Sequence, residues 1–198
     1  MKTSFKPEQL QIFDLGPQCD VFYHSKWLKF QEARNYYQVL REKIPFQQHR
    51  VAIMGTIIDQ PRLTCWFGDS SYTYSGLTIN PDPWFPELLQ LRDKLREDLG
   101  VDFNSVLANY YFDGSSGIGW HADNEKQIGP VIASVSLGGL RQFGIQNISA
   151  NKNYTIELQT GSLIVMAGET QKYCRHQIAK TSRPVEPRIN LTFRVLQS

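Results

Sequence analysis

The sequence predicts a mostly β protein with α-helices toward the N-terminus, an α+β chain built around a jelly-roll core, or double-stranded β-helix. Downstream of Gly100, short segments rich in β-branched and aromatic residues alternate with turn signals such as Asp113-Gly114 and Gly138-Gly139. Strands at this spacing are typical of a β-sandwich or barrel. Upstream of Gly100, two segments instead carry apolar residues at the spacing of an amphipathic helix. Together the two patterns predict helices that buttress a single β core.

The first predicted helix covers 25–43, and the chain before it is expected to be mostly irregular. Apolar residues recur at helical intervals in this helix, Ser25 is a plausible cap, and Pro45 lies just past the end. Residues 1–24 contain a Gly-Pro break, and only 21–23 are apolar enough to predict a short strand.

The next part of the chain predicts strand-like segments and a second helix. Residues 51–58 are rich in β-branched side chains and predict a strand interrupted at Gly55. The aromatic, turn-rich stretch 61–74 predicts irregular strand and loop. The second helix begins near 83–86 and ends at Gly100, where a left-handed cap is easy. One face of this helix carries Leu88, Leu91, Leu95 and Leu99. This face is predicted to pack on a sheet and to carry no chemistry.

The predicted strands of the C-terminal half complete the core. They are 105–112, 131–137, 141–146, 154–158, 162–166 and 189–196. With 198 residues, the chain is long enough for one domain with a sizeable core, and no internal repeat or low-complexity tract is visible in it.

The composition is that of an ordinary globular protein. Hydrophobic residues make up 41% and charged residues 20%, and no stretch approaches the roughly 20 apolar residues of a membrane helix. Residues 1–5 show no secretory signal and the scattered cysteines do not suggest a disulfide framework, so we expect a cytoplasmic protein, or a nuclear one in a eukaryote. Cys65 and Cys174 lie in apolar neighbourhoods and are expected to be buried packing residues.

Charge is nearly balanced overall but uneven near the C-terminus. The net charge of +2 neither indicates nor excludes a nucleic-acid partner. Between Lys172 and Arg194, however, Glu186 is the one acid among several basic residues. A basic face there could meet phosphates, although solvated charge is the commoner explanation of such a run.

His121 and Asp123 are the first candidates for chemistry. They are two positions apart, so on an extended segment both side chains leave the same face. His176 is the one histidine downstream and is predicted to supply a third ligand once the chain folds. Two histidines and a carboxylate with open positions are the ligand set of non-haem Fe(II) oxygenases. By itself the spacing arises often by chance, and a lone histidine is more often a core or surface residue. His24 and His49 have no carboxylate two residues away and are assigned no role.

The final predicted strand alternates strictly between two kinds of side chain. One face carries Ile189, Leu191, Phe193 and Val195, and the other carries Arg188, Asn190, Thr192 and Arg194. A half-exposed antiparallel strand would show this alternation, and from the alternation alone that is the commoner case. The sharper hypothesis is a polar interior in which two guanidinium groups hold a small dicarboxylate, because a planar guanidinium pairs with a carboxylate through two hydrogen bonds.

A second polar pair lies on the predicted strand 105–112. Asn109 and Tyr111 share a face with Leu107 on a strand that runs toward the His121 turn. A core tyrosine with a satisfied hydroxyl is the ordinary interpretation. Beside a metal, the amide and the phenol would donate hydrogen bonds to a bound oxyacid.

These residues together resemble the AlkB family of Fe(II)- and 2-oxoglutarate-dependent dioxygenases. The resemblance rests on His121-Ala122-Asp123, the distant His176, and the run from Arg188 to Arg194. That run has the family's Arg-x-Asn-x-Thr-Phe-Arg form and is more specific than the metal triad. Further matches, in the family's order, are Pro61-Arg62, Tyr72-Thr73-Tyr74-Ser75-Gly76, the Asn109/Tyr111 pair and Ala133-Ser134-Val135-Ser136-Leu137-Gly138. The resemblance covers roughly residues 45–196.

The resemblance implies a metal centre and a co-substrate site. The catalytic centre would hold Fe(II) through His121, Asp123 and His176. Arg188 would pair with the carboxylate of 2-oxoglutarate nearer the metal, and Arg194 with the far one. Hydrogen bonds to the same co-substrate would come from Asn109, Tyr111 and Asn190.

The resemblance also implies an alkylated base as the substrate. A base inside a duplex cannot reach the metal, so it must be flipped into a pocket or taken from a single strand. Aromatic walls would stack on the base there. Positions that match the family's base-lid and pocket region are Trp66, Tyr72, Tyr74 and Glu125. Met54 lies where duplex-acting relatives carry a hydrophobic finger that fills the hole left by a flipped base, or it is an ordinary buried strand residue.

The implied function is that of a DNA repair dioxygenase. It would use O₂ and 2-oxoglutarate to dealkylate N-alkylated bases of the 1-methyladenine and 3-methylcytosine type, releasing aldehyde, succinate and CO₂. The alternatives are an RNA- or protein-directed member of the same family and a nucleic-acid-binding module without catalysis. We expect a monomer that binds alkylated DNA, single- or double-stranded, and no membrane. Within one structural domain, 1–45 would be an N-terminal extension and helix packed on the core. Residues 46–198 would form the dioxygenase jelly roll, with a nucleotide-recognition lid at about 46–80.

Overall fold

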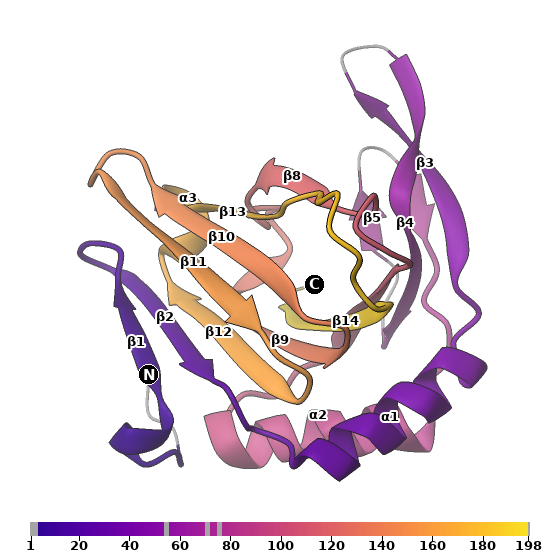
Figure 1. The fold of residues 1–198 in the computed structure, drawn as a ribbon, viewed down its shortest axis with the longest axis horizontal. Helices are drawn as coiled ribbons and strands as arrows, with labels where there is room; N and C mark the ends of the chain where they lie inside the picture. The colour runs from indigo at the N-terminus through magenta and orange to yellow at the C-terminus, as the bar shows by residue number, and fades with distance from the viewer. Residues whose placement is uncertain (1–3, 54–55, 70–71, 75–76, 198) are drawn as a thin grey trace.

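A computed structural model describes residues 4–53, 56–69, 72–74 and 77–197, and in these ranges the chain is mostly β with a few helices (Figure 1). The described strands form an 8-stranded sheet, a 4-stranded sheet that faces it and a small hairpin. The mostly β prediction is confirmed. Two facing sheets of antiparallel strands are consistent with the predicted jelly roll.

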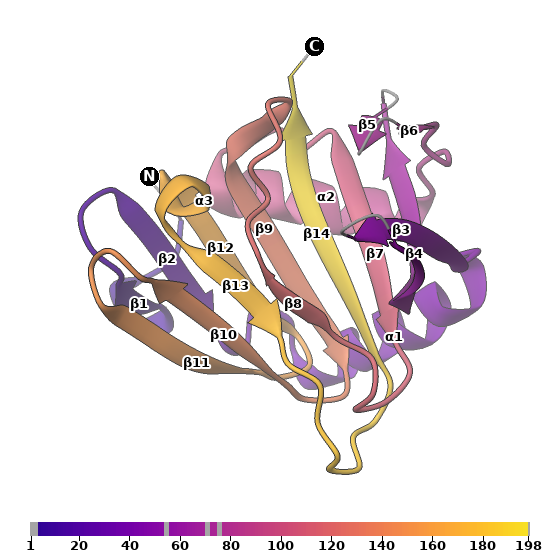
Figure 2. The ribbon, with the colours of Figure 1, turned by 90° about the horizontal axis from the view of Figure 1, so that it is seen from above.

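The larger sheet has the order β1-β2-β12-β9-β14-β7-β4-β3. Its strands are β1 (Gln11–Asp14), β2 (Cys19–His24), β12 (Ser162–Gly168), β9 (Ile128–Gly138), β14 (Arg188–Leu196), β7 (Ser105–Tyr111), β4 (Thr56–Gly68) and β3 (Gln47–Ile53). Figure 2 shows β14 between β9 and β7 in the middle of this sheet. Asn190 of β14 pairs with Ser136 of β9 on one side and with Asn109 of β7 on the other. The polar face of β14 therefore lies at the centre of the fold.

The smaller sheet has the order β11-β10-β13-β8. Its strands are β11 (Lys152–Leu158), β10 (Arg141–Asn147), β13 (Arg175–Ile178) and β8 (Ile118–His121). The sequence did not predict β8 or β13, because strands of 4 residues are too short to display an alternating period. A separate hairpin joins β5 (Tyr72–Tyr74) to β6 (Leu77–Ile79).

Helices α1 (Phe30–Lys43) and α2 (Pro86–Leu99) cover the outer face of the larger sheet (Figures 1 and 2). They contact each other through the hydroxyl of Tyr36, which donates to Gln90 Oε1 at 3.3 Å. The four leucines predicted to pack on a sheet are all buried. Each fully buried leucine stabilises the fold by about 1.5–3 kcal/mol. The helix ends as predicted, with Gly100 in the left-handed region at φ 65° and its N–H donating to Arg96 O. Short helices η1 (Pro7–Gln9) and α3 (Thr170–Tyr173) complete the described helices.

The predicted start of the first helix was wrong. The helix begins at Phe30, and Lys29 stands at the cap position without a side-chain hydrogen bond. The backbone N–H of Leu28 instead donates to Gly161 O at 2.9 Å. This bond ties the chain to the turn before β12 ahead of the helix, and Ser25 does not cap it.

Two strand predictions also need correction. Residues 4–24, the described part of the stretch expected to be mostly irregular, include β1 and β2, which extend the larger sheet, and β2 pairs with β12. The stretch 61–68 is a regular part of β4, paired with β7 from Leu63 to Gly68. Here tertiary pairing outweighs a turn-like sequence. The proline at 61 is tolerated because the register of β3 against β4 is irregular between Gln48 and Arg50. The predicted break at Gly55 lies outside the described residues, between strands that pair as a hairpin.

The larger sheet has an apolar core on each face. One core lies between this sheet and the two long helices, where Ile189, Leu191 and Phe193 of β14 meet the leucines of α2. The second core lies between the two sheets and includes Phe143 and Met166. Cys65 and Cys174 are free and buried, as predicted.

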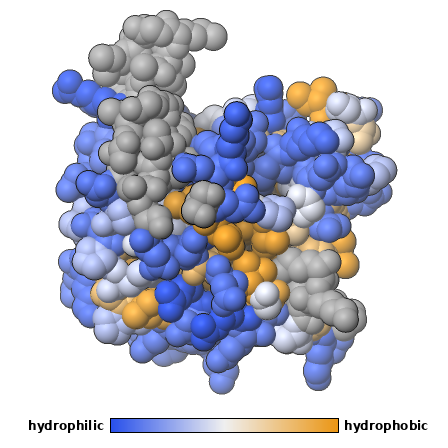
Figure 3. Space-filling view, turned by 180° about the vertical axis from the view of Figure 1, so that it is seen from behind, coloured by the Kyte–Doolittle hydropathy of each residue, from blue (hydrophilic) through white to orange (hydrophobic). Residues whose placement is uncertain are grey.

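The face opposite to that of Figure 1 is largely hydrophilic where it is coloured (Figure 3). On the face opposite to that of Figure 1, apolar side chains gather near the middle and hydrophilic ones surround them (Figure 3). None of the described helices has the length and apolar character required to cross a membrane.

Candidate metal centre and cavity

His121 and His176 are brought together by the pairing of two short strands. His176 of β13 lies opposite His121 of β8 in the register, and the ring centroids are 4.3 Å apart. His121 is partly exposed, whereas His176 is buried and stacks on Phe143. Nδ1 of His121 lies 2.8 Å from the carbonyl oxygen of Gly119. A proton on Nδ1 would donate to that oxygen, and Nε2 would keep its lone pair for a metal ion.

Asp123 joins the two histidines from the loop that follows β8. Its Oδ1 lies 3.8 Å from His121 Nε2, and one possible ligand atom from each of the three residues lies within 4.8 Å of the others. Strand β8 ends at His121, so Asp123 reaches the centre from the loop that follows, and the two side chains converge as the spacing suggested.

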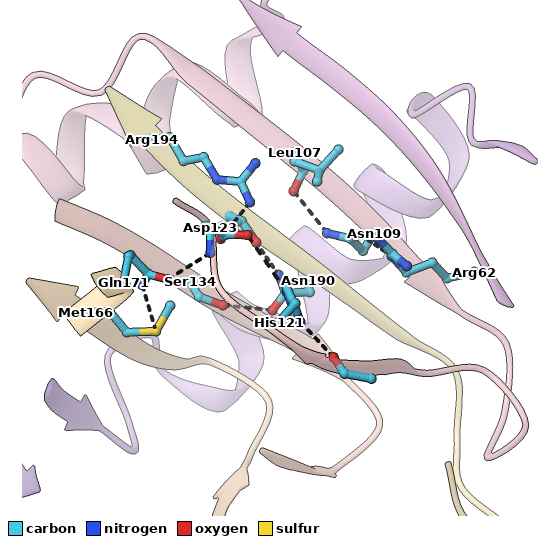
Figure 4. A network of polar contacts seen from close by, with 12 residues as sticks. Arg62, Leu107, Asn109, His121, Asp123, Ser134, Met166, Gln171, Asn190 and Arg194 are labelled. Atoms are coloured by element: carbon cyan, nitrogen blue, oxygen red, sulfur yellow. Dashed lines mark hydrogen bonds and ion pairs between the residues drawn. The ribbon is translucent and has the colours of Figure 1, made fainter. Parts of the chain in front are cut away.

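Two hydrogen bonds hold Asp123 in this position (Figure 4). Its backbone N–H donates to Gln171 Oε1 at 2.9 Å. Its Oδ2 accepts a hydrogen bond from Arg194 Nη2 at 2.7 Å, which is also an ion pair between two buried side chains. Helix α3 thus fixes the backbone of Asp123, and strand β14 fixes its carboxylate.

The electrostatics of the three residues suit metal binding. Burial would raise the pKa of Asp123, but Arg194 and the two histidines outweigh it and lower this pKa to about 2. Burial lowers the pKa of His176 to about 4, against the opposing attraction of Asp123. At neutral pH the centre therefore offers an ionised carboxylate and a neutral imidazole, the forms in which both bind a metal.

The donor set fits a divalent metal ion. His176 Nδ1 is buried and has no hydrogen-bond partner among the residues that the structure describes. A buried polar atom left unsatisfied costs about 1–3 kcal/mol, so such an atom in a prebuilt cluster is a mark of a binding site. Imidazole and carboxylate ligands accept Fe(II), and also Mn(II), Co(II) and Ni(II).

A cavity of about 240 Å³ adjoins the three residues and is lined by side chains of both sheets. The predicted site residues that line it are Trp66, Asn109, Tyr111, His121, Asp123, Glu125, His176, Asn190 and Arg194. Asn190, Thr192 and Arg194 of β14 are buried although they are polar, because the smaller sheet covers this face. The half-exposed strand that alternation alone favoured is therefore wrong, and the polar interior is correct.

Arg194, and not Arg188, lies beside the metal ligands. The two arginines are six positions apart on one strand, which separates their Cα atoms by about 20 Å. Arg194 binds Asp123, and Arg188 lies six positions away on the same strand, whereas the predicted pairing with 2-oxoglutarate placed Arg188 nearer the metal end. Both side chains are buried, so they do not belong to a basic surface. The exposed basic residues of that run are Lys172, Arg175, Lys180 and Arg183.

Arg188 is fully buried and is not among the residues that line the cavity. Its Nη2 donates to Ser136 Oγ at 2.9 Å and to Asn190 Oδ1 at 2.7 Å, and its guanidinium carbon lies 5.3 Å from the centre of the Tyr111 ring. Its Nε and Nη1 have no hydrogen-bond partner in the described part of the chain. Burial lowers the pKa of Arg188 to about 10, against the opposing effect of Tyr111, so the side chain stays charged at neutral pH.

A polar network continues across the floor of the cavity. Asn190 Oδ1 accepts a hydrogen bond from Ser134 Oγ at 2.9 Å, and its Nδ2 donates to Thr192 Oγ1 at 2.7 Å. Asn109 Oδ1 accepts a hydrogen bond from Arg62 Nε at 2.7 Å. The two asparagines predicted to contact a co-substrate are therefore already oriented by their neighbours.

Several residues of the site were missed by the sequence. His49, which was assigned no role, lines the cavity together with Arg50. On β4, the sequence also missed Gln60, Arg62 and Thr64, which line the cavity at every second position in the same row as the predicted Trp66. This period of two was the available signal, and it was lost because 61–74 was interpreted as irregular. Gln171 had no signal, since it lies on a helix of 4 residues.

Three predicted substrate residues remain predictions. Met54 lies outside the described residues. Tyr72 and Tyr74 are the ends of β5, but the structure describes only their backbone. Glu125, by contrast, lines the cavity, and its Oε2 is buried without a hydrogen-bond partner among the described residues.

Known proteins resemble this chain over most of its length. A family model described as the 2OG-Fe(II) oxygenase superfamily matches residues 20–194. Alpha-ketoglutarate-dependent dioxygenase alkB homolog 3 of Bos taurus is 37% identical over 182 residues, which cover 86% of this chain and 64% of that protein. DNA oxidative demethylase ALKBH2 of Arabidopsis thaliana is 33% identical over 217 residues, covering 94% of this chain and 69% of that protein.

The chain spans less than two thirds of the length of the alkB homolog 3 relatives that it matches. A solved structure described as that of OsALKBH1 superimposes with a TM-score of 0.59 at 20% identity, covering 94% of this chain and 99% of that one. At this identity the likeness concerns the fold alone.

Proposed function

Because this chain belongs to the AlkB family of the 2OG-Fe(II) oxygenase superfamily, we propose that it is a dioxygenase that dealkylates damaged DNA bases. Its substrates would be N-alkylated bases of the 1-methyladenine and 3-methylcytosine type, and its products an aldehyde, succinate and CO₂. The observation that carries the proposal is the convergence of His121, Asp123 and His176 within 4.8 Å beside a cavity with a charged, polar wall.

The metal ligands would be His121, Asp123 and His176. When bound, Fe(II) with 2-oxoglutarate and O₂ supplies the oxidising chemistry that hydroxylation of an N-alkyl carbon requires, which side-chain acids and bases cannot supply. Arg194 would keep Asp123 ionised and oriented through its hydrogen bond to Oδ2. Gly119 O would hold the proton of His121 on Nδ1 and leave Nε2 to bind the metal.

The co-substrate would lie along the polar face of β14. Arg188 would bind the carboxylate farther from the metal through Nη1, which has no hydrogen-bond partner among the described residues. Arg194 would face the carboxylate nearer the metal. Hydrogen bonds to the same molecule would come from Asn109, Tyr111 and Asn190. Burial of these groups excludes water, which strengthens each charged hydrogen bond.

The base would occupy the outer part of the cavity. Trp66, together with Tyr72 and Tyr74 of β5, would provide aromatic contact. Glu125 Oε2 would accept a hydrogen bond from the exocyclic amino group, which 1-methyladenine and 3-methylcytosine both carry. Met54 would act as the finger that replaces the flipped base. Among the residues that the sequence missed, His49 of β3 lines the same cavity and would also contact the base.

The proposal includes the architecture around this site. The core would be a double-stranded β-helix in a single domain, with 1–45 packed on 46–198 and a nucleotide-recognition lid at about 46–80. The protein would act as a monomer on alkylated single- or double-stranded DNA, in the cytoplasm or nucleus.

An assay with Fe(II), 2-oxoglutarate and methylated oligonucleotides tests this function. Base products would be quantified by mass spectrometry, and succinate in parallel, for single-stranded DNA, duplex DNA, RNA and a methylated peptide. We expect demethylation of DNA that requires Fe(II), 2-oxoglutarate and O₂. It should be lost in His121→Ala but not in His24→Ala, which changes a histidine outside the cavity. Turnover of RNA or peptide with none of DNA would overturn the DNA assignment. Succinate formation that His121→Ala does not change would indicate a binding module.

A further inference from the structure

We propose that Gln171 is a positioning residue that sets the carboxylate of Asp123 for metal binding, an inference that rests on the proposed function. The side-chain amide of Gln171 bridges two parts of the chain (Figure 4). Its Oε1 accepts a hydrogen bond from the backbone N–H of Asp123 at 2.9 Å, and its Nε2 donates to Met166 Sδ at 3.4 Å. Met166 lies on β12 and is buried between the two sheets, so it offers a fixed reference point.

The short helix α3 that carries Gln171 is itself tied down at both ends. At its start, the N–H of Glu169 donates to Gln18 O at 2.7 Å, and Thr170 Oγ1 donates to Ala167 O at 2.5 Å. At its end, the buried Sγ atoms of Cys174 and Cys19 are 3.5 Å apart. A helix of one turn has little stability of its own. Its contacts with β2 and β12 therefore keep the Gln171 amide in one orientation.

Asp123 needs such a tether because β8 no longer supports it. The strand ends at His121, and in the described part of the chain the bond to Gln171 is the one hydrogen bond of the Asp123 backbone. Arg194 meanwhile attracts the carboxylate through Oδ2 at 2.7 Å, whereas Oδ1 is 3.8 Å from His121 Nε2. Without the tether, the carboxylate can turn toward Arg194 and away from the histidines. Gln171 thus balances the pull of Arg194 and keeps Oδ1 at the metal centre.

Three substitutions separate positioning from general stability. Gln171→Met keeps the side-chain length but removes the acceptor, and Gln171→Glu keeps an acceptor oxygen. Lys172→Met is the matched control, because Lys172 lies on the same helix, is exposed and contacts the exposed Glu169. The Mn(II) affinity of each purified protein would be measured by electron paramagnetic resonance without any substrate, alongside its Tm.

We expect Gln171→Met to bind Mn(II) about 10- to 100-fold more weakly than wild type, the usual loss when a group that orients a metal ligand is removed. Gln171→Glu should recover most of the affinity, and Lys172→Met should equal wild type. Wild-type affinity in Gln171→Met, or an equal loss in Gln171→Met and Gln171→Glu, would refute the positioning role.

Amide hydrogen exchange in the metal-free wild type gives a test that needs no variant to fold. The Asp123 N–H should exchange more slowly than the amide of the neighbouring exposed residue Asn124, and free exchange at Asp123 would refute the tether. Failure of the proposed function looks different. In that case the wild type fails to bind Mn(II) or to dealkylate DNA, while exchange at Asp123 still reports on Gln171.

Discussion

The two walls of the cavity are built in different ways. On the metal side, His176 and Asp123 are buried, and every ligand is held by a neighbour within the fold. His121 meets Gly119 O, Asp123 meets Gln171 and Arg194, and His176 is stacked on Phe143 with the rings 25° from parallel. The side chains of this wall are therefore held in place before a metal ion or co-substrate binds.

The β3–β4 wall includes the buried Thr64 and Trp66 of β4 but is much more exposed toward β3. His49 is partly exposed, and the side chain of Arg50 is 76% exposed, with an ion pair to Asp59, which is itself 65% exposed. Arg62 stands between the two kinds of wall, since it is partly buried and its Nε donates to Asn109 on β7. Exposure to solvent thus increases from β14 outward to β3.

The difference matches two different tasks. A metal ion with its co-substrate needs ligands held to within a few tenths of an ångström, which requires burial and fixed hydrogen bonds. A damaged base arrives on a long, charged polymer and must be accepted in several contexts, which suits exposed polar side chains that can adjust. Substitutions on the metal wall should therefore affect stability and chemistry together, and those on the β3–β4 wall should affect substrate binding alone.

The largest effect is expected for Asp123→Ala. It removes a proposed metal ligand, so the proposed dealkylation should fall by more than the ~100-fold that loss of a mere supporting group causes. It also removes the charge that compensates Arg194 at 2.7 Å, and loss of one partner of a buried ion pair costs about 3–5 kcal/mol. Urea denaturation of the metal-free protein would measure this loss.

Unfolding in acid tests the ion pair between Asp123 and Arg194 in a second way. The pKa of Asp123 is lowered from 3.8 to about 2 in the folded chain, so its contribution is present above pH 3.8 and is lost as pH falls toward 2. As pH falls from 3.8 toward 2, the wild type should lose unfolding free energy through Asp123, and Asp123→Ala should not show this loss. Equal unfolding midpoints for the two proteins at pH 7 would show that the ion pair does not stabilise the metal wall.

A smaller effect is expected for Arg188→Met at the far end of β14. Loss of a hydrogen bond to a charged group costs about 1.5–3 kcal/mol, so the KM for 2-oxoglutarate should rise about 10- to 100-fold while kcat at saturation is largely kept. Methionine of similar volume in a buried site should preserve stability. Steady-state kinetics with 2-oxoglutarate as the varied substrate would measure this.

Arg194→Met provides the contrast, because it should lower kcat as well through its contact with Asp123. Similar kinetics for the two variants would contradict the order of the arginines along the co-substrate.

The same contrast between walls explains what could be predicted from the sequence. The metal triad and the polar face of β14 were predictable, because the order of the motifs and the strict alternation of polar and apolar residues can be read directly from the sequence. The position of Arg194 beside Asp123 was not, since strand direction relative to the metal depends on pairing with β7 and β9. The β3–β4 wall was mostly missed, because the period of two on β4 was hidden by its proline and aromatic residues. Gln171 depends on contacts from β2 and β12, which no local pattern encodes.

A moderate effect, confined to binding of the DNA substrate, is expected for His49→Ala. Stacking of a base on a ring is worth about 1–3 kcal/mol, and for a partly exposed ring the lower end applies, so the KM for methylated DNA should rise roughly 5- to 10-fold. Mn(II) affinity and the KM for 2-oxoglutarate should not change. His24→Ala is the matched control, because His24 contacts Phe5 away from the cavity. A loss of metal affinity in His49→Ala would mean that the two walls are not independent.

The smallest effect is expected for Arg50→Ala, and its character is more telling than its size. Arg50 and Asp59 form an ion pair in which both side chains are largely exposed. Such a pair adds little stability, so the substitution should leave the unfolding midpoint unchanged. If Arg50 meets a phosphate, removing it lowers the slope of log K against log salt by about 0.7 for single strands and 0.9 for duplex DNA. Fluorescence anisotropy with methylated and unmethylated oligonucleotides, across a salt series, would measure both slopes. The change in slope should be the same for methylated and unmethylated oligonucleotides, because a phosphate contact carries no information about the base. A loss restricted to the methylated strand would instead assign Arg50 to base recognition and extend the ordered part of the site as far as β3.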